Sequence, residues 1–327
     1  MRTKGYSLFC LFLGIFLVVS LETGLCAESS TYPDRPITVV VPFAPGGTTD
    51  VCARIIAEGM EKYLKQPIIV VSKPGAGTTI AGNFVANAKP DGYTIGFLTP
   101  STFSAELYSF LYPVPYSSKD LIPVSGIVEV YQAMMVKGDA PWNSLKDLVE
   151  YAQKNPGLKI ATLGKAHFSY YLTLIIARQE KIDFTSVPFD GGSKMVPPLL
   201  GGHVPVGVTG VDPSIKSLLD AKKLRALAML NGKRGEIFSE IPSMVELGYK
   251  NPFLSITGLF APKGTSEEVV KRIDEAVHKI IEEKDVRTKI FNTTAELHYL
   301  ESVSYKKSLI TFKEKMHEFF KAEGLVK

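Results

Sequence analysis

Glycine and hydroxyl residues recur where predicted strands end, and these residue types could bind an anion without ionised side chains. Two such segments are 46–49 (GGTT) and 75–79 (GAGTT). Glycine lets the backbone approach a ligand closely, because it has no Cβ. A helix that starts just after such a loop offers unpaired N–H groups and the positive end of its dipole. Two such loops facing one cleft would suit a carboxylate, although each could also serve only to make its turn.

Three further loops after predicted strands carry polar candidates. Ser101 and Thr102 follow a third strand, and Gly164 precedes His167 after a later one. His167 could donate to a carboxylate or cap the helix that follows it. Asp190, ahead of a glycine pair, could accept from a ligand ammonium or hydroxyl, or stabilise its own turn.

Motifs for catalysis, metals and cofactors are absent from the sequence. There is no Gly-x-Ser-x-Gly elbow, no His-Glu-x-x-His and no P-loop lysine, and the histidines show no metal-ligand spacing. The segment 75–80 half-resembles a dinucleotide fingerprint, but Ile80 stands in place of the third glycine. Ser169 or Ser193 beside His167 leaves an exported hydrolase as the one catalytic alternative. We therefore expect a binding protein that is no enzyme and needs no metal or cofactor.

The N-terminus predicts export. Arg2 and Lys4 precede an apolar run over 8–19, and small residues end the segment near 24–27. This is the pattern of a secretory signal peptide. The run is shorter than the about 20 apolar residues that span a bilayer. We expect residues 1–27 to be removed, with lipid anchoring at Cys26 as the alternative, and a mature protein that does not span a membrane.

The mature chain offers few other partners. It keeps one cysteine, Cys52, which excludes an internal disulfide framework and a cysteine zinc cluster. Cys52 lies among small apolar residues, so a buried structural thiol is expected. The 37 basic and 33 acidic residues of the whole chain form no basic stripe interleaved with aromatics. Nucleic acid is therefore not an expected partner.

The hydrophobic pattern predicts two α/β series. Short apolar runs at 37–41, 68–71 and 93–98 alternate with helical segments, which is typical of a parallel sheet. A second series has a long strand over 127–136, a helix capped by Ser144 and Asp147, and strands at 158–162, 186–189, 204–208 and 224–230. The chain returns at 256–260 and closes with helices over 266–283 and 305–322. We expect one lobe of residues 32–128 and 255–327, a second of 129–254, and a ligand cleft between them.

Motifs spread along the whole mature chain resemble one family. They are PFAPGGTTD at 42–50, KPGAG at 73–77, KPDGYT at 89–94, LLGGHV at 199–204, IPSMVELG at 241–248 and APKGT at 261–265. The sequence thereby resembles the Bug-type (TctC-like) substrate-binding receptors of tripartite tricarboxylate transporters. The resemblance implies a two-lobed periplasmic-binding-protein fold, type II-like. It also implies capture of a di- or tricarboxylate, amino acid or aromatic acid by lobe closure, and delivery to two integral-membrane subunits from the periplasm.

The resemblance also implies site residues. One carboxylate would be held by Phe43, Gly47, Thr48, Ala76 and Thr78, partly through water. With the loop residues above, the expected ligand-binding set is Phe43, Gly46, Gly47, Thr48, Asp50, Ala76, Gly77, Thr78, Ser101, Thr102, Gly164, His167, Asp190 and Gly191. Asp190 stands where the family more often has a basic residue, so it would suit a ligand amino group. A sensor that presents its closed form to a signalling receptor is the alternative function.

Overall fold

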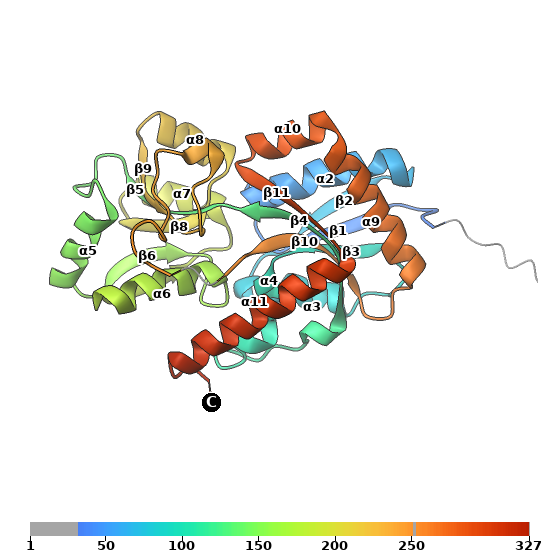
Figure 1. The fold of residues 1–327 in the computed structure, drawn as a ribbon, viewed down its shortest axis with the longest axis horizontal. Helices are drawn as coiled ribbons and strands as arrows, with labels where there is room; N and C mark the ends of the chain where they lie inside the picture. Colours follow the sequence, from blue (N-terminus) through green and yellow to red (C-terminus); the bar gives the residue numbers. More distant parts are fainter. Residues whose placement is uncertain (1–31, 251–252, 327) are drawn as a thin grey trace, which may run out of the picture. The chain divides into compact units, whose positions relative to one another are not determined.

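The structure is a computed structural model that describes residues 32–250 and 253–326. The predicted signal peptide over 1–27 and Cys26 lie outside the described residues. Residues 35–327 form one compact unit built on two β-sheets, each with its own helices (Figure 1). We call the six-stranded sheet with its helices lobe 1 and the five-stranded sheet with its helices lobe 2. The mixed α/β, two-lobed architecture expected from the sequence is confirmed.

The sheet of lobe 1 has the strand order β11-β4-β10-β3-β1-β2. Strand β1 pairs in parallel with β2 and β3, while β10 runs antiparallel between β3 and β4, and β11 is antiparallel to β4. The bounds are β1 Ile37–Val41, β2 Ile68–Ser72, β3 Thr94–Leu98, β4 Leu121–Val130, β10 Ile256–Pro262 and β11 Ala295–Glu301. The mostly apolar sequence of β1 fits its buried place between β3 and β2.

The sheet of lobe 2 has the order β7-β6-β8-β5-β9. Strands β6, β7 and β8 are parallel, and β5 is antiparallel to β8 and β9. The bounds are β5 Gln132–Lys137, β6 Leu158–Thr162, β7 Phe184–Pro188, β8 Val206–Gly210 and β9 Leu224–Met229.

Helices follow most of the parallel strands. Those of lobe 1 are α2 Thr48–Leu64, α3 Thr79–Ala86, α4 Pro100–Phe103, α9 Glu267–Glu282, α10 Lys284–Asn292 and α11 Ser302–Ala322. Those of lobe 2 are α5 Leu145–Lys154, α6 Phe168–Glu180, α7 Gly192–Leu200 and α8 Pro213–Asp220. Short 3₁₀ turns are η2 Ala76–Thr78, η3 Ala105–Tyr108, η4 Ser118–Asp120 and η5 Glu236–Phe238. None of the helices within the described ranges is both long and apolar enough to cross a membrane.

The predicted cap of α5 is confirmed. The Asp147 N–H donates to Ser144 Oγ at 3.1 Å, and the Ser144 N–H donates back to the Asp147 carboxylate at 3.1 Å. This reciprocal pair satisfies two N–H groups at the end of the helix. These hydrogen bonds, with that from the Asn143 N–H first, hold the pKa of Asp147 below its ordinary value.

The single long strand predicted over 127–136 is wrong. Strand β4 ends at Val130 in lobe 1, and β5 begins at Gln132 in lobe 2, so the chain changes sheets at Tyr131 (Figure 1). Glu129 pairs with Ile256 and Glu296, whereas Gln132 pairs with Gly210 of the other sheet. The apolar pattern is continuous through Tyr131, because both strands are buried, and therefore it does not mark the crossing.

The C-terminal prediction missed α10 and β11. Strand β11 has the sequence AELHYLE and lies at the edge of its sheet, with most residues only partly buried. An edge strand lacks the continuous apolar run that predicts a buried one. Helix α2 begins at Thr48, within the segment 46–49.

Helix α11 joins the two lobes on one side. Its Phe320 lies 4.6 Å from the ring of Tyr171 on α6, and Phe312 lies 6.1 Å from Phe168. These rings belong to the apolar core that also holds α5 and α6 of lobe 2. Cys52 is fully buried in lobe 1, where burial raises the pKa of its thiol to about 12, as expected for a structural thiol.

Candidate ligand-binding site

A small, partly open cavity lies where loops of the two lobes meet. Its free volume is about 30 Å³, which exceeds the about 10–15 Å³ that a single water needs. The residues that line it are Phe43, Gly47, Thr48, Thr49, Thr99, Val130, Gln132, Leu163, His167, Phe168, Gly192, Thr209, Gly210, Ser255 and Thr257. Within the described chain, this lining contains hydroxyl, amide, imidazole and apolar groups and no carboxylate, ammonium or guanidinium.

Three helices begin at this cavity. Thr48 starts α2, Phe168 starts α6 and Gly192 starts α7, and all three residues are part of the lining. Gly47 precedes α2 and Gly191 precedes α7, and neither helix has a side-chain cap among the described residues. First-turn N–H groups have no partner inside their own helix, and they carry the positive end of the helix dipole. The cavity therefore faces N–H groups of helix N-termini and has no ionised side chain in its lining.

Two buried side-chain atoms in the lining have no hydrogen-bond partner among the described residues. They are Thr48 Oγ1 and Gln132 Oε1, on side chains of residues that are 5% and 4% exposed. Buried polar atoms are nearly always hydrogen-bonded, and leaving one unpaired costs about 1–3 kcal/mol. Two such atoms on one cavity mark the place where a polar ligand would be received.

Asp50, predicted to bind ligand, instead shapes the loop before α2. Its carboxylate accepts from the Gly46 N–H at 3.0 Å and from Arg54 at 3.0 and 3.1 Å. Gly46 has a φ of +86°, which favours glycine, and this turn directs the chain into α2. Neither Gly46 nor Asp50 lines the cavity.

His167 caps α6 and also lines the cavity. The Ser169 N–H donates to Nδ1 at 3.3 Å, and the Ser169 hydroxyl lies 2.8 Å from the same nitrogen. Burial lowers the pKa of His167 to about 3, so the ring is neutral at physiological pH. Because Nδ1 accepts the cap, the proton of the neutral ring resides on Nε2. The two roles considered for His167 are thus compatible, since capping leaves an N–H donor on the ring.

The loop after β2 borders a second, more open hollow of about 630 Å³. Ala76, Gly77 and Thr78 line it with left-handed φ values of 45°, 58° and 83°. Tyr112 donates to Ala76 O at 2.7 Å, and Thr102 Oγ1 donates to Thr78 Oγ1 at 2.8 Å. Non-glycine residues with positive φ are uncommon and are held in place by their surroundings.

Asp190 and Gly164 also line this second hollow. The Asp190 residue is exposed and is not part of the cavity lining. Its backbone oxygen accepts from the Ala44 N–H at 3.0 Å. Phe43 lines both the small cavity and the second hollow.

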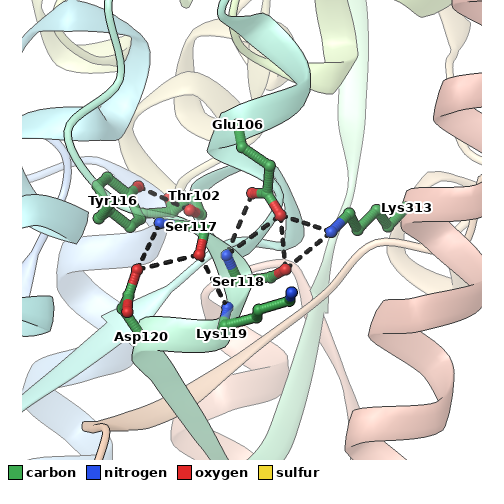
Figure 2. A network of polar contacts seen from close by, with 8 residues as sticks. All are labelled: Thr102, Glu106, Tyr116, Ser117, Ser118, Lys119, Asp120 and Lys313. Carbon is green, nitrogen blue, oxygen red and sulfur yellow. Dashed lines mark hydrogen bonds and ion pairs between the residues drawn. The ribbon is translucent and has the colours of Figure 1, made fainter.

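A polar network holds the segment that carries Ser101 and Thr102 (Figure 2). Tyr116 donates to Thr102 O at 2.7 Å, and Lys313 of α11 contacts Glu106 and Ser118. Ser101 and Thr102 line neither space. Ser101 Oγ instead accepts from the Phe168 N–H of lobe 2 at 3.0 Å.

Three hydrogen bonds join the strand-end loops of the two lobes, and others join the lobes elsewhere, such as that from Thr294 Oγ1 to Val211 O. Besides the bond from Phe168 to Ser101, the Ala44 N–H donates to Asp190 O, and Ser193 Oγ donates to Pro45 O at 3.1 Å. Gly191 lies against Ala44, where an added Cβ would be 3.3 Å from the Ala44 nitrogen. The strand-end loops of both lobes are therefore closed on one another.

Of the fourteen expected site residues, the cavity brings together Phe43, Gly47, Thr48 and His167. Thr49, in the segment 46–49 singled out from the sequence, also lines it. The sequence analysis did not single out most of the other lining residues. Thr209 and Gly210 end β8, so the strand-end rule applied to the other loops could have found them. Gln132 was not recognised, because it lies within the segment 127–136 that the sequence pattern predicted to be one strand.

Comparison with known proteins identifies the family. Residues 52–325 match the model of the tripartite tricarboxylate transporter family receptor, TctC. The chain belongs to this receptor family. The Bordetella pertussis protein BugT is 31% identical over 282 residues, covering 84% of each chain.

Two solved structures of similar proteins were determined with a small carboxylate. MatC from Rhodopseudomonas palustris, with bound malate, is 30% identical, with a TM-score of 0.76 over 89% of this chain and 98% of MatC. A second R. palustris protein, solved with adipate, is 27% identical, with a TM-score of 0.83 over 90% of this chain and 98% of that one. Both share the fold of the receptor described here.

Proposed function

We propose that this receptor captures a small carboxylate between its lobes, with the anionic group at the small cavity, and does no chemistry on it. The observation that carries the proposal is the lining itself. Two uncapped helix N-termini and an unpartnered Thr48 hydroxyl face a space without ionised side chains. Such a site favours an anion, because fixed N–H dipoles replace its hydration without a competing buried charge.

The proposed binding mode begins at Thr48. The carboxylate would accept from the first-turn N–H groups of α2 and from Thr48 Oγ1, and His167 Nε2–H would add a donor from lobe 2. Phe43 and Leu163 would cover the apolar part of the ligand. Because donors come from both lobes, the ligand stabilises the closed form, in which residues 32–128 with 255–327 meet residues 129–254.

The proposal extends to transport. The malate and adipate bound to the two relatives are small carboxylates, which supports the same ligand class here. We propose that the mature protein acts in the periplasm after removal of residues 1–27. Its closed form would deliver the ligand to two integral-membrane subunits of a tripartite tricarboxylate-type transporter.

Calorimetric titration of the mature protein with malate, succinate, adipate and other small carboxylates tests this function. We expect saturable one-to-one binding of at least one of them, without turnover. Thr48→Val should weaken it by roughly ten- to hundred-fold, because a hydrogen bond to a charged group contributes about 1.5–3 kcal/mol. Thr288→Val is the matched control, since the Thr288 hydroxyl bonds only its own helix, at Lys284 O. Equal affinities for Thr48→Val and the wild type would contradict the proposed site.

A further inference from the structure

A polar cluster joins the two lobes beside the crossing at Tyr131. Its two carboxylates, Glu129 on β4 and Glu296 on β11, belong to lobe 1. Asn231 Nδ2 donates to Glu129 Oε1 at 2.7 Å, and Lys233 Nζ donates to Glu296 Oε1 at 2.7 Å. The Tyr131 hydroxyl also donates to Glu296. Both carboxylates of lobe 1 are therefore bonded by side chains from outside its sheet.

The donors Asn231 and Lys233 are fixed to lobe 2. They follow β9, which ends at Met229. The adjacent Arg234 donates to Glu246 at 2.9 and 2.8 Å, and the segment that carries Glu246 is bonded to the backbone of Met229. When the lobes separate, as the proposed function requires for ligand entry, both donors move away from lobe 1 with β9.

His298 is a further ionisable group of the cluster, and it belongs to lobe 1. Its Nε2 lies 3.3 Å from Glu129 Oε2 and 3.6 Å from Glu296 Oε1. Glu129 and Glu296 are directly opposite each other in the pairing of β4 with β11, so this group of three does not depend on lobe 2. Glu129 is only 5% exposed, and a buried carboxylate needs a partner. A protonated His298 and the donors of lobe 2 therefore compete for the same two carboxylates.

Other charged groups near β11 contact different neighbours. Asp274 of α9 accepts from the Tyr299 hydroxyl at 3.2 Å, and Arg287 of α10 lines a hollow that Glu296 also lines. Helix α11 places the buried Tyr305 ring against β4. Within the described chain, the charged groups that act on the His298 ring are Glu129, Glu296 and Lys233.

Lobe opening changes the proton affinity of His298. The Glu129 carboxylate raises the pKa of His298 above its ordinary value, Glu296 acts in the same direction, and Lys233 lowers it. On opening, both carboxylates stay beside the ring, whereas Lys233 leaves. The pKa of His298 is therefore higher in the open form than in the closed form, so proton binding favours the open form. Above this pKa the ring is neutral and the carboxylates depend on the donors of lobe 2, which favours closure.

We propose that His298 is a pH-sensitive switch of lobe closure, in which the protonated ring takes Glu129 and Glu296 from lobe 2 and favours the open form. The inference goes beyond ligand capture and rests only on the movement of the lobes. Asn231 connects the switch to the cavity, because its Oδ1 accepts from the N–H of the lining residue Gln132 at 2.7 Å. A ligand captured at neutral pH would therefore be released more readily in an acidic medium.

Distances between two spin labels test the switch without any ligand. The labels are placed in the mature protein by Lys154→Cys on α5 of lobe 2 and Lys271→Cys on α9 of lobe 1, both exposed positions. Cys52 is fully buried and should stay unlabelled. We expect two populations of distances, with the ratio of open to closed rising about two- to five-fold from pH 8 to pH 6, the range that an exposed ion pair such as Lys233–Glu296 supplies.

His298→Gln should abolish this response, because glutamine keeps a polar side chain but takes up no proton. His278→Gln is the matched control, since His278 lies on α9 beside Glu282 and has no part in the cluster. It should respond to pH like the wild type. A response that survives in His298→Gln, or a wild type with equal populations at pH 8 and pH 6, would overturn the switch.

The role of Lys233 has its own readout in the nuclear magnetic resonance titration of the His298 ring. Lys233→Met removes the cation that lowers the pKa of His298, so the ring should titrate at higher pH than in the wild type. Lys216→Met is the control, because Lys216 pairs with Asp220 inside α8. It should leave the titration unchanged. An unchanged midpoint in Lys233→Met would contradict the competition on which the switch depends.

The same labels separate this inference from the proposed function. If malate, succinate or adipate shortens the distance but pH does not change it, the carboxylate function stands and only the switch fails. If the distance stays the same with every ligand and at both pH values, the lobes do not move, and lobe closure and the switch fail together.

Discussion

Gly77→Ala should hold the two lobes apart while leaving each lobe folded. Gly77 lies in the loop after β2, and a Cβ built on it would be 2.4 Å from Ala166 Cβ and 2.7 Å from the Tyr112 hydroxyl. Ala166 belongs to the loop before α6 in lobe 2 and is 1% exposed. The clash with Ala166 therefore acts across the lobe boundary.

The required movement sets the size of the effect. Ordinary contact begins at 3.4 Å, so a distance of 2.4 Å must grow by about 1 Å. The interlobe hydrogen bonds from Ala44, Phe168 and Ser193 are 3.0, 3.0 and 3.1 Å long. A 1 Å separation takes them beyond bonding distance. Each contributes about 0.5–1.5 kcal/mol, so closure would lose about 1.5–4.5 kcal/mol, or roughly ten- to thousand-fold in ligand affinity.

Calorimetry with whichever carboxylate binds the wild type measures this loss, and small-angle scattering with ligand shows whether the closed form is reached. Gly202→Ala is the matched control. Gly202 has a φ of +72°, close to the +58° of Gly77, but a Cβ there meets nothing within 4 Å. It carries the same kind of backbone strain without the clash.

The double variant Gly77→Ala/Ala166→Gly should recover part of the affinity, because it removes the clashing Cβ of lobe 2. Wild-type affinity in Gly77→Ala would refute the reasoning. An equal loss in Gly202→Ala would assign the effect to backbone strain instead of lobe closure.

Three further outcomes follow from side chains away from the cavity. Asp50→Ala should lower stability by about 1–3 kcal/mol in urea unfolding and also weaken ligand binding, because the Gly46 N–H and Arg54 lose their acceptor. Ser144→Ala should cost about 1 kcal/mol of stability and leave ligand affinity unchanged, since its cap lies in α5. The Glu129 carboxylate, 3.3 Å from His298, raises the pKa of His298 above 6.5. The protonated ring therefore stabilises the fold below about pH 6.5, and this contribution is lost as pH rises through the folded pKa. His298→Gln should flatten that part of the profile of unfolding free energy against pH.

The sequence by itself determined the fold class, the family and several of the loops that line the two hollows. Buried parallel strands are rich in apolar residues, so β1, β6 and the helices after them were predictable from local pattern. The cap at Ser144 was also predictable, because it depends on residues three apart. The same holds for Phe43, Gly47, Thr48 and His167, which follow strand ends and line the cavity.

Only the tertiary structure decided how the site is completed. Gln132 lines the cavity because the chain changes sheets at Tyr131, which opposes Gln132 to Gly210 of β8. Asp50 and Asp190 do not line the cavity. Asp50 bonds its own loop and Arg54, and Asp190 is exposed at the second hollow. The local sequence pattern indicates which residues are buried and whether their spacing fits a helix or a strand. The register between distant strands and the meeting of the two lobes depend on contacts between residues far apart in the chain.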